Sequence, residues 1–528
     1  MAKAAGAYDA IVIGGGHNGL ACACYLAAAR LRVCVLERRP VLGGAAVTEE
    51  FHPGFRNSLA SYTVSLLNPK VIADLRLAEH GLRIVERPFA NFLPTDDNYL
   101  KVGGGLEATQ REVARFSRRD AERLPEYYAR LDAVADVLRG LVLETPPNVG
   151  GGIQELFVAW KAGRRLNALP LAAKRDVLDL FTLSATEWLD RWFESEPLRA
   201  CLAFDSVVGN FASPHAPGSA YVLLHHVFGE VNGKRGAWGH AIGGMGAITQ
   251  AMAAEARARG VELRTDAPVA CIEVRDGKAR GVTLASGEML PARCVVSNAH
   301  PRLLLDLLPD VPGDWRNAFS AYRSESATFR MNVALSELPD FPVLPGRQAE
   351  PHHGAGIILA PSVDFMDRAY ASAREHGWSR EPIVEMLIPS TVDASLAPAG
   401  AHVASLFCQH FRYALPAGHD WDDEREKAAQ AVITHVTRFA PNFRAAVIAK
   451  RVLSPLDLER ELGLVGGDIF HGKLSLNQLF SARPVLGYGN YRMPVRGVYL
   501  CGSGAHPGGG VTGAPGHNAA REVIRDLK

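Results

Sequence analysis

Three glycines near the N-terminus have the spacing that brings a polypeptide backbone close to a phosphate. Gly14, Gly16 and Gly19 follow a buried-strand pattern at 8–13 and precede a small, apolar run at 20–29 that suits a helix. In such a strand, turn and helix, the first glycine permits the tight turn and the second lets the backbone approach a pyrophosphate. The third lets the helix pack on the strand, and the helix N-terminus favours the anion. The pattern predicts a dinucleotide site.

The next segment favours FAD over NAD as the dinucleotide. A second apolar strand at 31–36 ends in Glu37, about 20 residues past the glycine turn, where a carboxylate can accept hydrogen bonds from ribose hydroxyls. A further glycine pair, Gly43-Gly44, follows almost at once. Glycines there indicate a second close approach of the backbone to an extended cofactor.

The C-terminus carries another glycine-dense junction between a strand at 497–500 and a closing helix. Its Gly502-x-Gly504-x-x-Pro507 fails the dinucleotide pattern at the third position. We therefore interpret this segment as backbone that wraps the flavin end of the same cofactor.

Two histidines are candidates for proton chemistry beside a flavin. His506 lies in the C-terminal glycine segment, where a neutral imidazole can accept or relay a proton near physiological pH, and His471 lies in the loop before it. A structural role is the alternative for both. His225 and His226 follow an apolar helical stretch, and we expect them to be structural.

The sequence lacks the motifs of several other kinds of chemistry. The cysteines are scattered and include no C-x-x-C pair, which disfavours a metal cluster, a redox disulfide and disulfide reductase activity. No spaced His/Cys/carboxylate cluster and no G-x-S-x-G elbow is present, so we predict neither a metal site nor acyl chemistry.

The length and net charge of the chain limit the possible folds and partners. Its 528 residues exceed what one hydrophobic core usually supports, and a formal charge of +1 makes nucleic acid an unsuitable partner. The first motif leaves no room for a signal peptide before it, and the apolar run at 20–29 is about half of what a membrane span needs. The turn at 303–308 is either a core helix or a segment that dips into a bilayer surface.

The order of patterns predicts an α/β protein, with a discontinuous Rossmann-type FAD-binding domain, an inserted α+β substrate domain and a helical cap. We place the FAD-binding domain at 1–68, 236–300 and 485–528. Helical periodicity from 69 onward predicts the helical cap and substrate region at 69–235. Mixed patterns place the α+β substrate domain at 301–484.

The chain resembles the phytoene desaturase-like (carotenoid desaturase and ketolase) flavoproteins from about residue 8 to 527. The resemblance rests on YDAIVIGGGHNGL, ERRPVLGGAAVTEE, WFESEPL, SPHAPGSAYVLLHHV, GAWGHAIGGMGA, DIFHGKLSLNQLFSARP and LCGSGAHPGGGVTGAPG. It implies FAD as cofactor, held by Gly14, Gly16, Asn18, Gly19, Glu37, Arg38, Gly44, Ala45, Gly502, Ser503, Gly510, Val511 and Thr512, with Val269 contacting the adenine end through its backbone.

We expect an FAD-dependent oxidoreductase that removes hydride from an apolar, isoprenoid- or carotenoid-like small molecule, with oxygen or a quinone as electron acceptor. The alternatives are ketolase or isomerase chemistry, or a flavin-binding assembly factor at a membrane. We expect a cytoplasmic location, with peripheral contact at the inner face of a membrane left open; for animal relatives, the resemblance implies mitochondria. The sequence leaves the oligomeric state open.

Overall fold

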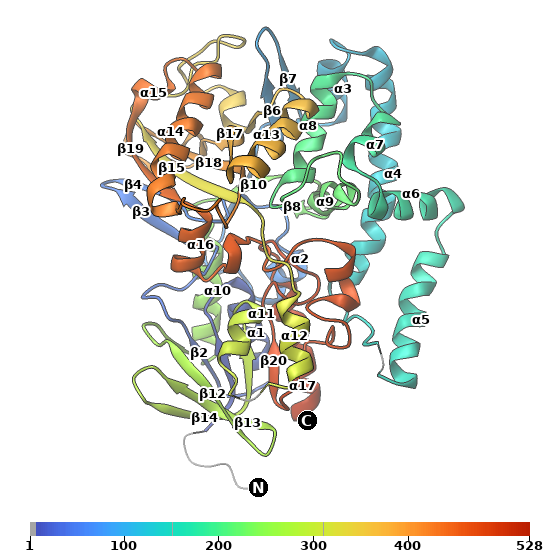
Figure 1. Cartoon of the computed structure of the whole chain (residues 1–528), viewed down its shortest axis with the longest axis vertical. Helices are drawn as coiled ribbons and strands as arrows, with labels where there is room; N and C mark the ends of the chain where they lie inside the picture. The colour runs from blue at the N-terminus through green and yellow to red at the C-terminus, as the bar shows by residue number, and fades with distance from the viewer. Residues whose placement is uncertain (1–6, 150, 310) are drawn as a thin grey trace.

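A mostly parallel sheet forms the base of the molecule. Its strands are β1 (Tyr8–Ile13), β2 (Val33–Leu36), β11 (Glu262–Arg264), β12 (Val269–Arg275), β13 (Lys278–Leu284), β14 (Met289–Ser297) and β20 (Val498–Leu500). The computed structural model describes residues 7–149, 151–309 and 311–528 and gives the strand order β11-β2-β1-β14-β13-β12, with β20 also paired to β14 (Figure 1). The pairs between β1, β2, β11, β14 and β20 are parallel, whereas β12, β13 and β14 pair antiparallel.

The first helix follows directly from the glycine turn. α1 (His17–Ala28) packs against α10 (Gly246–Ala258) and α17 (Ala514–Leu527), so segments from both ends and the middle of the chain meet at this sheet. Every residue of β1 is buried, as expected for an apolar strand covered on both faces. This confirms the predicted Rossmann-type α/β fold.

A second sheet lies above the first and is mostly antiparallel. It contains β6 (Asn91–Pro94), β7 (Tyr99–Val102), β15 (Thr328–Leu335), β16 (Gly356–Leu359), β17 (Trp378–Leu387), β18 (His402–Phe411) and β19 (Val447–Leu453). The strand order is β19-β15-β18-β17-β16-β6-β7. The helices of this region are α13 (Val363–His376), α14 (Trp421–Phe439), α15 (Phe443–Ala446) and α16 (Pro455–Leu462).

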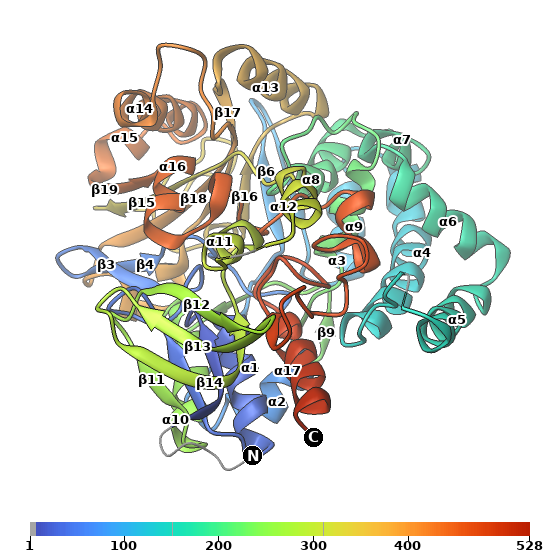
Figure 2. The ribbon, with the colours of Figure 1, turned by 60° about the horizontal axis from the view of Figure 1, so that its bottom comes forward.

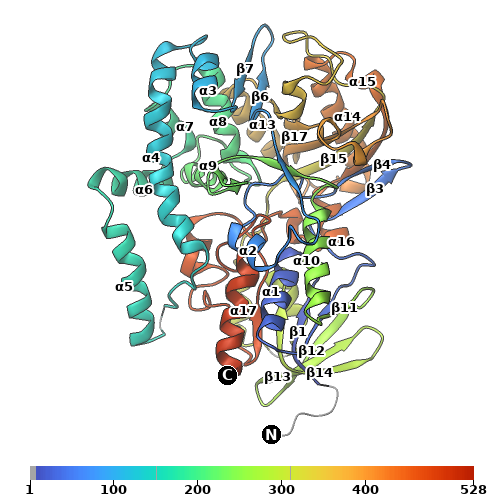
Figure 3. The same cartoon turned by 180° about the vertical axis from the view of Figure 1, so that it is seen from behind.

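A helical region stands beside the two sheets. It comprises α3 (Leu106–Val113), α4 (Arg118–Val142), α5 (Ile153–Asn167), α6 (Leu171–Thr182), α7 (Ala185–Asp190), α8 (Glu196–Val207) and α9 (Ser219–His226). Figures 2 and 3 show that α5 lies at the outer margin of the molecule. The predicted domain boundaries stay predictions.

Smaller elements connect these regions. They are α2 (Pro69–Asp74), α11 (Pro301–Asp306), α12 (Gly313–Ser320), β3 (Thr48–His52), β4 (Phe55–Ser58), β5 (Ile84–Glu86), β8 (Glu230–Val231), β9 (Lys234–Arg235) and β10 (Gly239–Ala241).

One sequence expectation needs correction, and the structure decides between the two alternatives for the turn at 303–308. Residues 84–102 form strands rather than part of a helical region, because β6 pairs in parallel with β16, more than 250 residues away, and this long-range pairing leaves no local periodic signal. In the turn at 303–308, Leu304, Leu305 and Leu308 are buried in the core, so these leucines are not available to dip into a bilayer.

Candidate active site

A cavity of about 400 Å³ opens where β1 and β2 end. We call it the strand-end cavity. Its position matches the rule that ligands of open α/β sheets bind beyond the carboxyl ends of parallel strands. The residues predicted from sequence that line it are Gly14, Gly16, Asn18, Glu37, Arg38, Gly44, Ala45, Val269, Ser503, Gly510, Val511 and His471.

The glycine turn leaves the start of α1 open to a ligand. Gly14 has φ of 97°, a conformation that favours glycine, and Gly16 is the N-cap of α1 without a side-chain capping bond. Gly19 does not line the cavity. A Cβ there would overlap the Gly14 carbonyl oxygen, so this glycine serves the packing of helix on turn, as its position in the motif predicted.

Glu37 closes the end of β2 with a buried carboxylate. Gly15 N donates to its Oε2 at 2.8 Å and Arg39 N to its Oε1 at 3.0 Å. The neighbouring Arg38 reaches across to α16, where its Nη2 donates to the carbonyl oxygens of Arg460 and Glu461 at 3.2 and 3.1 Å. The acid that we expected to bind ribose therefore also fixes the loop beside it.

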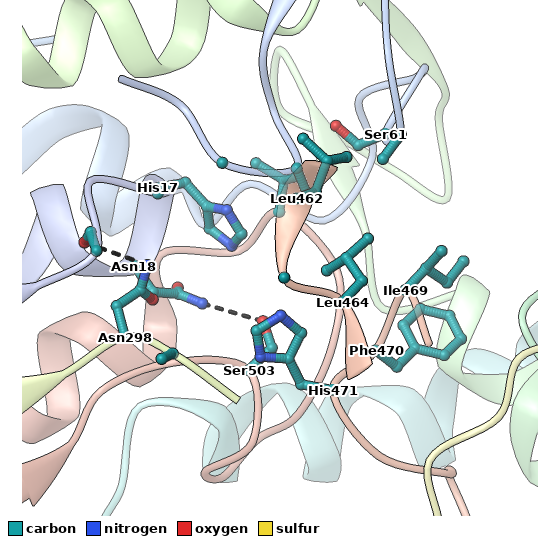
Figure 4. Close-up of a pocket in the computed structure, with 18 of the residues that line it drawn as sticks. His17, Asn18, Ser61, Asn298, Leu462, Leu464, Ile469, Phe470, His471 and Ser503 are labelled. Carbon is teal, nitrogen blue, oxygen red and sulfur yellow. Dashed lines mark hydrogen bonds between the residues drawn. The ribbon is translucent and has the colours of Figure 1, made fainter. Parts of the chain in front are cut away.

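The C-terminal glycine segment forms the opposite wall. Asn18 Nδ2 donates to Ser503 Oγ at 3.1 Å, which joins the start of α1 to this segment (Figure 4). Asn18 Oδ1 is buried and has no hydrogen-bond partner among the described residues. Gly502 and Thr512 do not line this cavity: Gly502 packs on the backbone of Asn298, and Thr512 faces a separate cleft.

His471 lines the same cavity, and Figure 4 shows its imidazole together with that of His17, the first residue of α1. Its φ of 56° is unusual for a residue other than glycine, and such strain collects at functional sites. Burial, together with the positive charge of Arg483 and with His17, lowers the pKa of His471 to about 3. The imidazole is therefore neutral at physiological pH.

His506 does not lie where the sequence suggested. It lines the separate cleft rather than the strand-end cavity, and its Nε2 is 3.1 Å from the Leu141 carbonyl oxygen at the end of α4. Tyr491 Oη donates to the His506 carbonyl oxygen at 2.9 Å. Burial lowers the pKa of His506 to about 4. Because the Leu141 contact holds the imidazole against α4 and outside the strand-end cavity, we propose no catalytic role for His506.

Sequence reasoning missed Arg483, which organises the wall around His471. This guanidinium is fully buried and donates to the carbonyl oxygens of Phe470 and Ser503, each at 2.7 Å. It thus joins the His471 loop to the C-terminal glycine segment. Arg483 stands in a stretch that carried the family resemblance, but no residue pattern distinguishes such an arginine from a surface one.

The end of the cavity away from the strands is apolar and aromatic. Tyr62, Val208, Trp238, Phe407 and Phe470 contribute to it. The Tyr62 ring stacks on Phe407 with centroids 4.8 Å apart, and its hydroxyl donates to the Glu385 carboxylate. The cavity therefore joins a polar, glycine-lined part to an apolar part.

These features fit a flavin dinucleotide. The N-terminus of α1 has no side-chain cap, which suits a pyrophosphate, and Glu37 directly follows the second strand. The buried Asn18 Oδ1 has no hydrogen-bond partner among the described residues, so it can accept a hydrogen bond from a bound cofactor. Over the described residues, no group of His, Cys, Asp and Glu has the arrangement to hold a metal ion.

A family model described as flavin containing amine oxidoreductase matches residues 19–327. The chain belongs to this family. As a member of the flavin-containing amine oxidoreductases it is an FAD-dependent oxidoreductase, which confirms the predicted cofactor and enzyme class.

Relatives of this oxidoreductase support the resemblance to desaturases. The chain is 42% identical over 550 residues to pyridine nucleotide-disulfide oxidoreductase domain-containing protein 2 of Rattus norvegicus, covering 99% of this chain and 94% of the rat protein. It is 25% identical to phytoene desaturase (lycopene-forming) of Pseudescherichia vulneris, covering 98% and 99%. Cyclohexylamine oxidase from Brevibacterium oxydans shares the fold, with a TM-score of 0.56, 17% identity and 99% coverage of both chains.

Proposed function

We propose that this FAD-dependent oxidoreductase removes a hydride from an apolar substrate of the isoprenoid or carotenoid-like class. The observation that carries the proposal is the apolar and aromatic end of the strand-end cavity, which adjoins the glycine-lined part that fits the cofactor. A bound flavin supplies the hydride acceptor. The relationship in sequence to a phytoene desaturase supports the same substrate class.

Amine oxidation, suggested by the family description and by cyclohexylamine oxidase, is the second candidate. An available carboxylate would stabilise a protonated amine, and Glu385 lies behind Tyr62 at this end of the cavity. That carboxylate already accepts from Tyr62 and lies 3.7 Å from Arg87 Nη1. Because its charge is already compensated, the site favours an uncharged substrate.

The chain's own residues position and shield the substrate. The stacked Tyr62 and Phe407 rings form part of the aromatic wall at this end of the cavity, and an apolar wall of this kind would exclude water from a bound polyene. The neutral His471 can accept a hydrogen bond but is too weak a base to hold a proton at neutral pH. We therefore assign His471 to positioning. The substrate would also lose a proton from the neighbouring carbon as the double bond forms, and this proton would pass to solvent through the polar, glycine-lined part of the cavity.

Anaerobic spectroscopy tests the substrate class. An isoprenoid polyene should bleach the flavin of the purified protein, whereas primary amines should not. Readmitting oxygen or adding a short-chain quinone then identifies the electron acceptor, for which we propose one of these two. Bleaching by amines alone would overturn the proposed substrate. Ketone formation after oxygen is readmitted would favour the ketolase alternative, and isomer formation without net bleaching would favour the isomerase alternative. Neither bleaching nor product with any candidate would favour an assembly role.

We also propose peripheral membrane contact through α5, on a protein located in the cytoplasm. No described helix has the length and apolar character to cross a bilayer. On α5, however, Ile153, Leu156, Phe157 and Trp160 are 86%, 69%, 64% and 54% exposed. Lys161, Arg164 and Arg165 follow on the same helix. Exposed aromatic and aliphatic side chains next to basic ones are typical of helices that lie on anionic membrane surfaces.

A further inference from the structure

A second hollow lies between α5, α6 and the C-terminal glycine segment, separate from the strand-end cavity. It has a volume of about 740 Å³, and we call it the α5 cleft. Its walls come from α4, α5, α6, α9 and residues 506–512. None of the chemistry assigned above uses this space.

A thin partition separates the α5 cleft from the strand-end cavity. Leu66 borders both hollows, while Gly510 borders the strand-end cavity and Gly509 the cleft. A Cβ on Gly510 would lie 2.6 Å from Leu66 Cδ1, and a Cβ on Gly509 would lie 2.6 Å from Phe470 Cβ. The two hollows therefore share a wall of bare backbone and two apolar side chains.

The cleft deepens from an open mouth to a closed inner end. At the mouth, Leu178 is 63% exposed and Leu166 is 36% exposed. At the inner end, Gly509, Thr512 and His506 are buried. An apolar surface of this depth is unfavourable against water, and the volume falls in the range of small-molecule sites. The apolar lining and the buried inner end suit a hydrocarbon chain.

Charged groups along the cleft favour an anionic end on that chain. The cleft is lined by two basic side chains, Arg139 and Lys174, and by one carboxylate, Glu230. The Arg139 guanidinium is already occupied by the Val227 and Phe228 carbonyl oxygens at 2.5 and 3.1 Å. Lys174 Nζ donates to the Asn167 side-chain oxygen at 3.1 Å, and among the described residues it forms no salt bridge. Lys174 is thus a cation available to a ligand.

We propose that the α5 cleft is a second binding site, for an amphiphile whose single apolar chain fills the cleft and whose anionic head pairs with Lys174. The ligand class is an acyl or isoprenoid acid. This site is independent of the flavin chemistry, so its test does not depend on turnover of a substrate.

Gly163 allows the cleft to be filled selectively. It lines the cleft on α5, and a Cβ there would meet no atom within 4 Å, so a larger side chain enters open space. Ala159 lines the cleft on the same helix, whereas Val158 does not. Gly163→Phe and Ala159→Phe therefore fill the cleft, and Val158→Phe is the matched control that adds the same ring elsewhere on α5.

The probes are the fluorescent acyl acid cis-parinaric acid and the uncharged isoprenoid retinol, titrated into the FAD-loaded protein. We expect saturable binding that weakens about tenfold or more in both filling variants and is unchanged in Val158→Phe. Lys174→Gln should weaken cis-parinaric acid about threefold and leave retinol unchanged. The affinity of retinoic acid, measured by displacement of cis-parinaric acid from the wild type, distinguishes the isoprenoid from the acyl source, because these two compounds share a carboxylate head. Absence of saturable binding, or equal affinity in the filled variants, would overturn the site. An unaltered acid affinity in Lys174→Gln would overturn the head-group assignment.

Discussion

Cofactor binding depends most on one side chain, the Glu37 carboxylate, which accepts hydrogen bonds from two backbone amides. Glu37 is buried at the end of β2, where Gly15 N and Arg39 N both donate to it. Such charge-assisted bonds are stronger than neutral ones, and removing the acceptor leaves two amides without a partner. The same side chain shapes the loop and faces the cavity.

Glu37→Ala should therefore lower FAD affinity. Loss of a hydrogen bond to a charged group costs about 1.5–3 kcal/mol, which corresponds to a loss of roughly tenfold to a hundredfold in affinity. Titration of the apoprotein with FAD, followed by flavin fluorescence, measures this change. Glu50→Ala, at an exposed position on β3, is the control. An unchanged dissociation constant for Glu37→Ala would show that the acid has been assigned wrongly.

In the C-terminal glycine segment, some glycines are needed because another part of the chain passes close to them, and not because of a positive φ. Gly508 and Gly510 have φ of 117° and 92°, but Gly509 is not among the residues with positive φ. A Cβ at Gly509 would lie 2.7 Å from Phe470 Cα. Gly509 is required because another backbone passes beside it.

Gly509→Ala should displace the Phe470 loop and with it His471. Overpacking of this kind costs about 1–3 kcal/mol of stability, and the rate of flavin reduction by substrate should fall as well. Urea unfolding and anaerobic stopped-flow spectroscopy measure the two effects. Gly313→Ala, where a Cβ would meet nothing within 4 Å, should alter neither. Wild-type stability and rate in Gly509→Ala would contradict this account of the partition.

Elements with local signals were predictable from the sequence, and those set by distant partners were not. The apolar strand, glycine turn and helix at β1 and α1 follow from residue pattern alone, and the structure confirms them. β6 was missed because its pairing with β16 is long-range. His506 lies outside the strand-end cavity, and no local pattern indicates this, because its bond to Leu141 depends on how α4 packs. Arg483 was missed for a similar reason, since its carbonyl partners are brought together only by the fold.

Across the whole molecule, buried neutral histidines set the response to acid. Burial is the main cause that lowers the pKa of these side chains to about 3 or 4: His17, His225, His226, His352, His410, His471 and His506. Below pH 6.5 the unfolded chain binds protons at these sites that the native state does not, so stability falls as pH falls. Asp205 and Asp468 oppose this, because burial raises their pKa to about 8 and about 6, but they are fewer.

We therefore expect the midpoint of urea unfolding to fall continuously from pH 7 to pH 5, through the range in which unfolded histidines gain their protons. The change should precede the loss of carboxylate ion pairs, which occurs at lower pH. A midpoint that stays constant between pH 7 and pH 5 would contradict the burial of these imidazoles in their neutral form.

The outer position of α5 is a second property of the whole molecule. If its exposed apolar face contacts lipid, the protein should float with vesicles containing phosphatidylglycerol and less with phosphatidylcholine alone. Replacing Phe157 and Trp160 by serine should abolish flotation, and Met289→Ser, at an equally exposed apolar position on β14, should not. Flotation that the double variant leaves intact would exclude α5 as the contact.

The central claim is that the strand-end cavity holds FAD and delivers an apolar substrate to it. One preparation tests this most directly: the purified protein is examined anaerobically in the spectrophotometer, and its cofactor is then released by acid and identified by mass. The account predicts a yellow protein that releases FAD and is bleached by an isoprenoid polyene. A colourless protein that binds only NAD, or an FAD protein bleached by amines and never by apolar substrates, would contradict it.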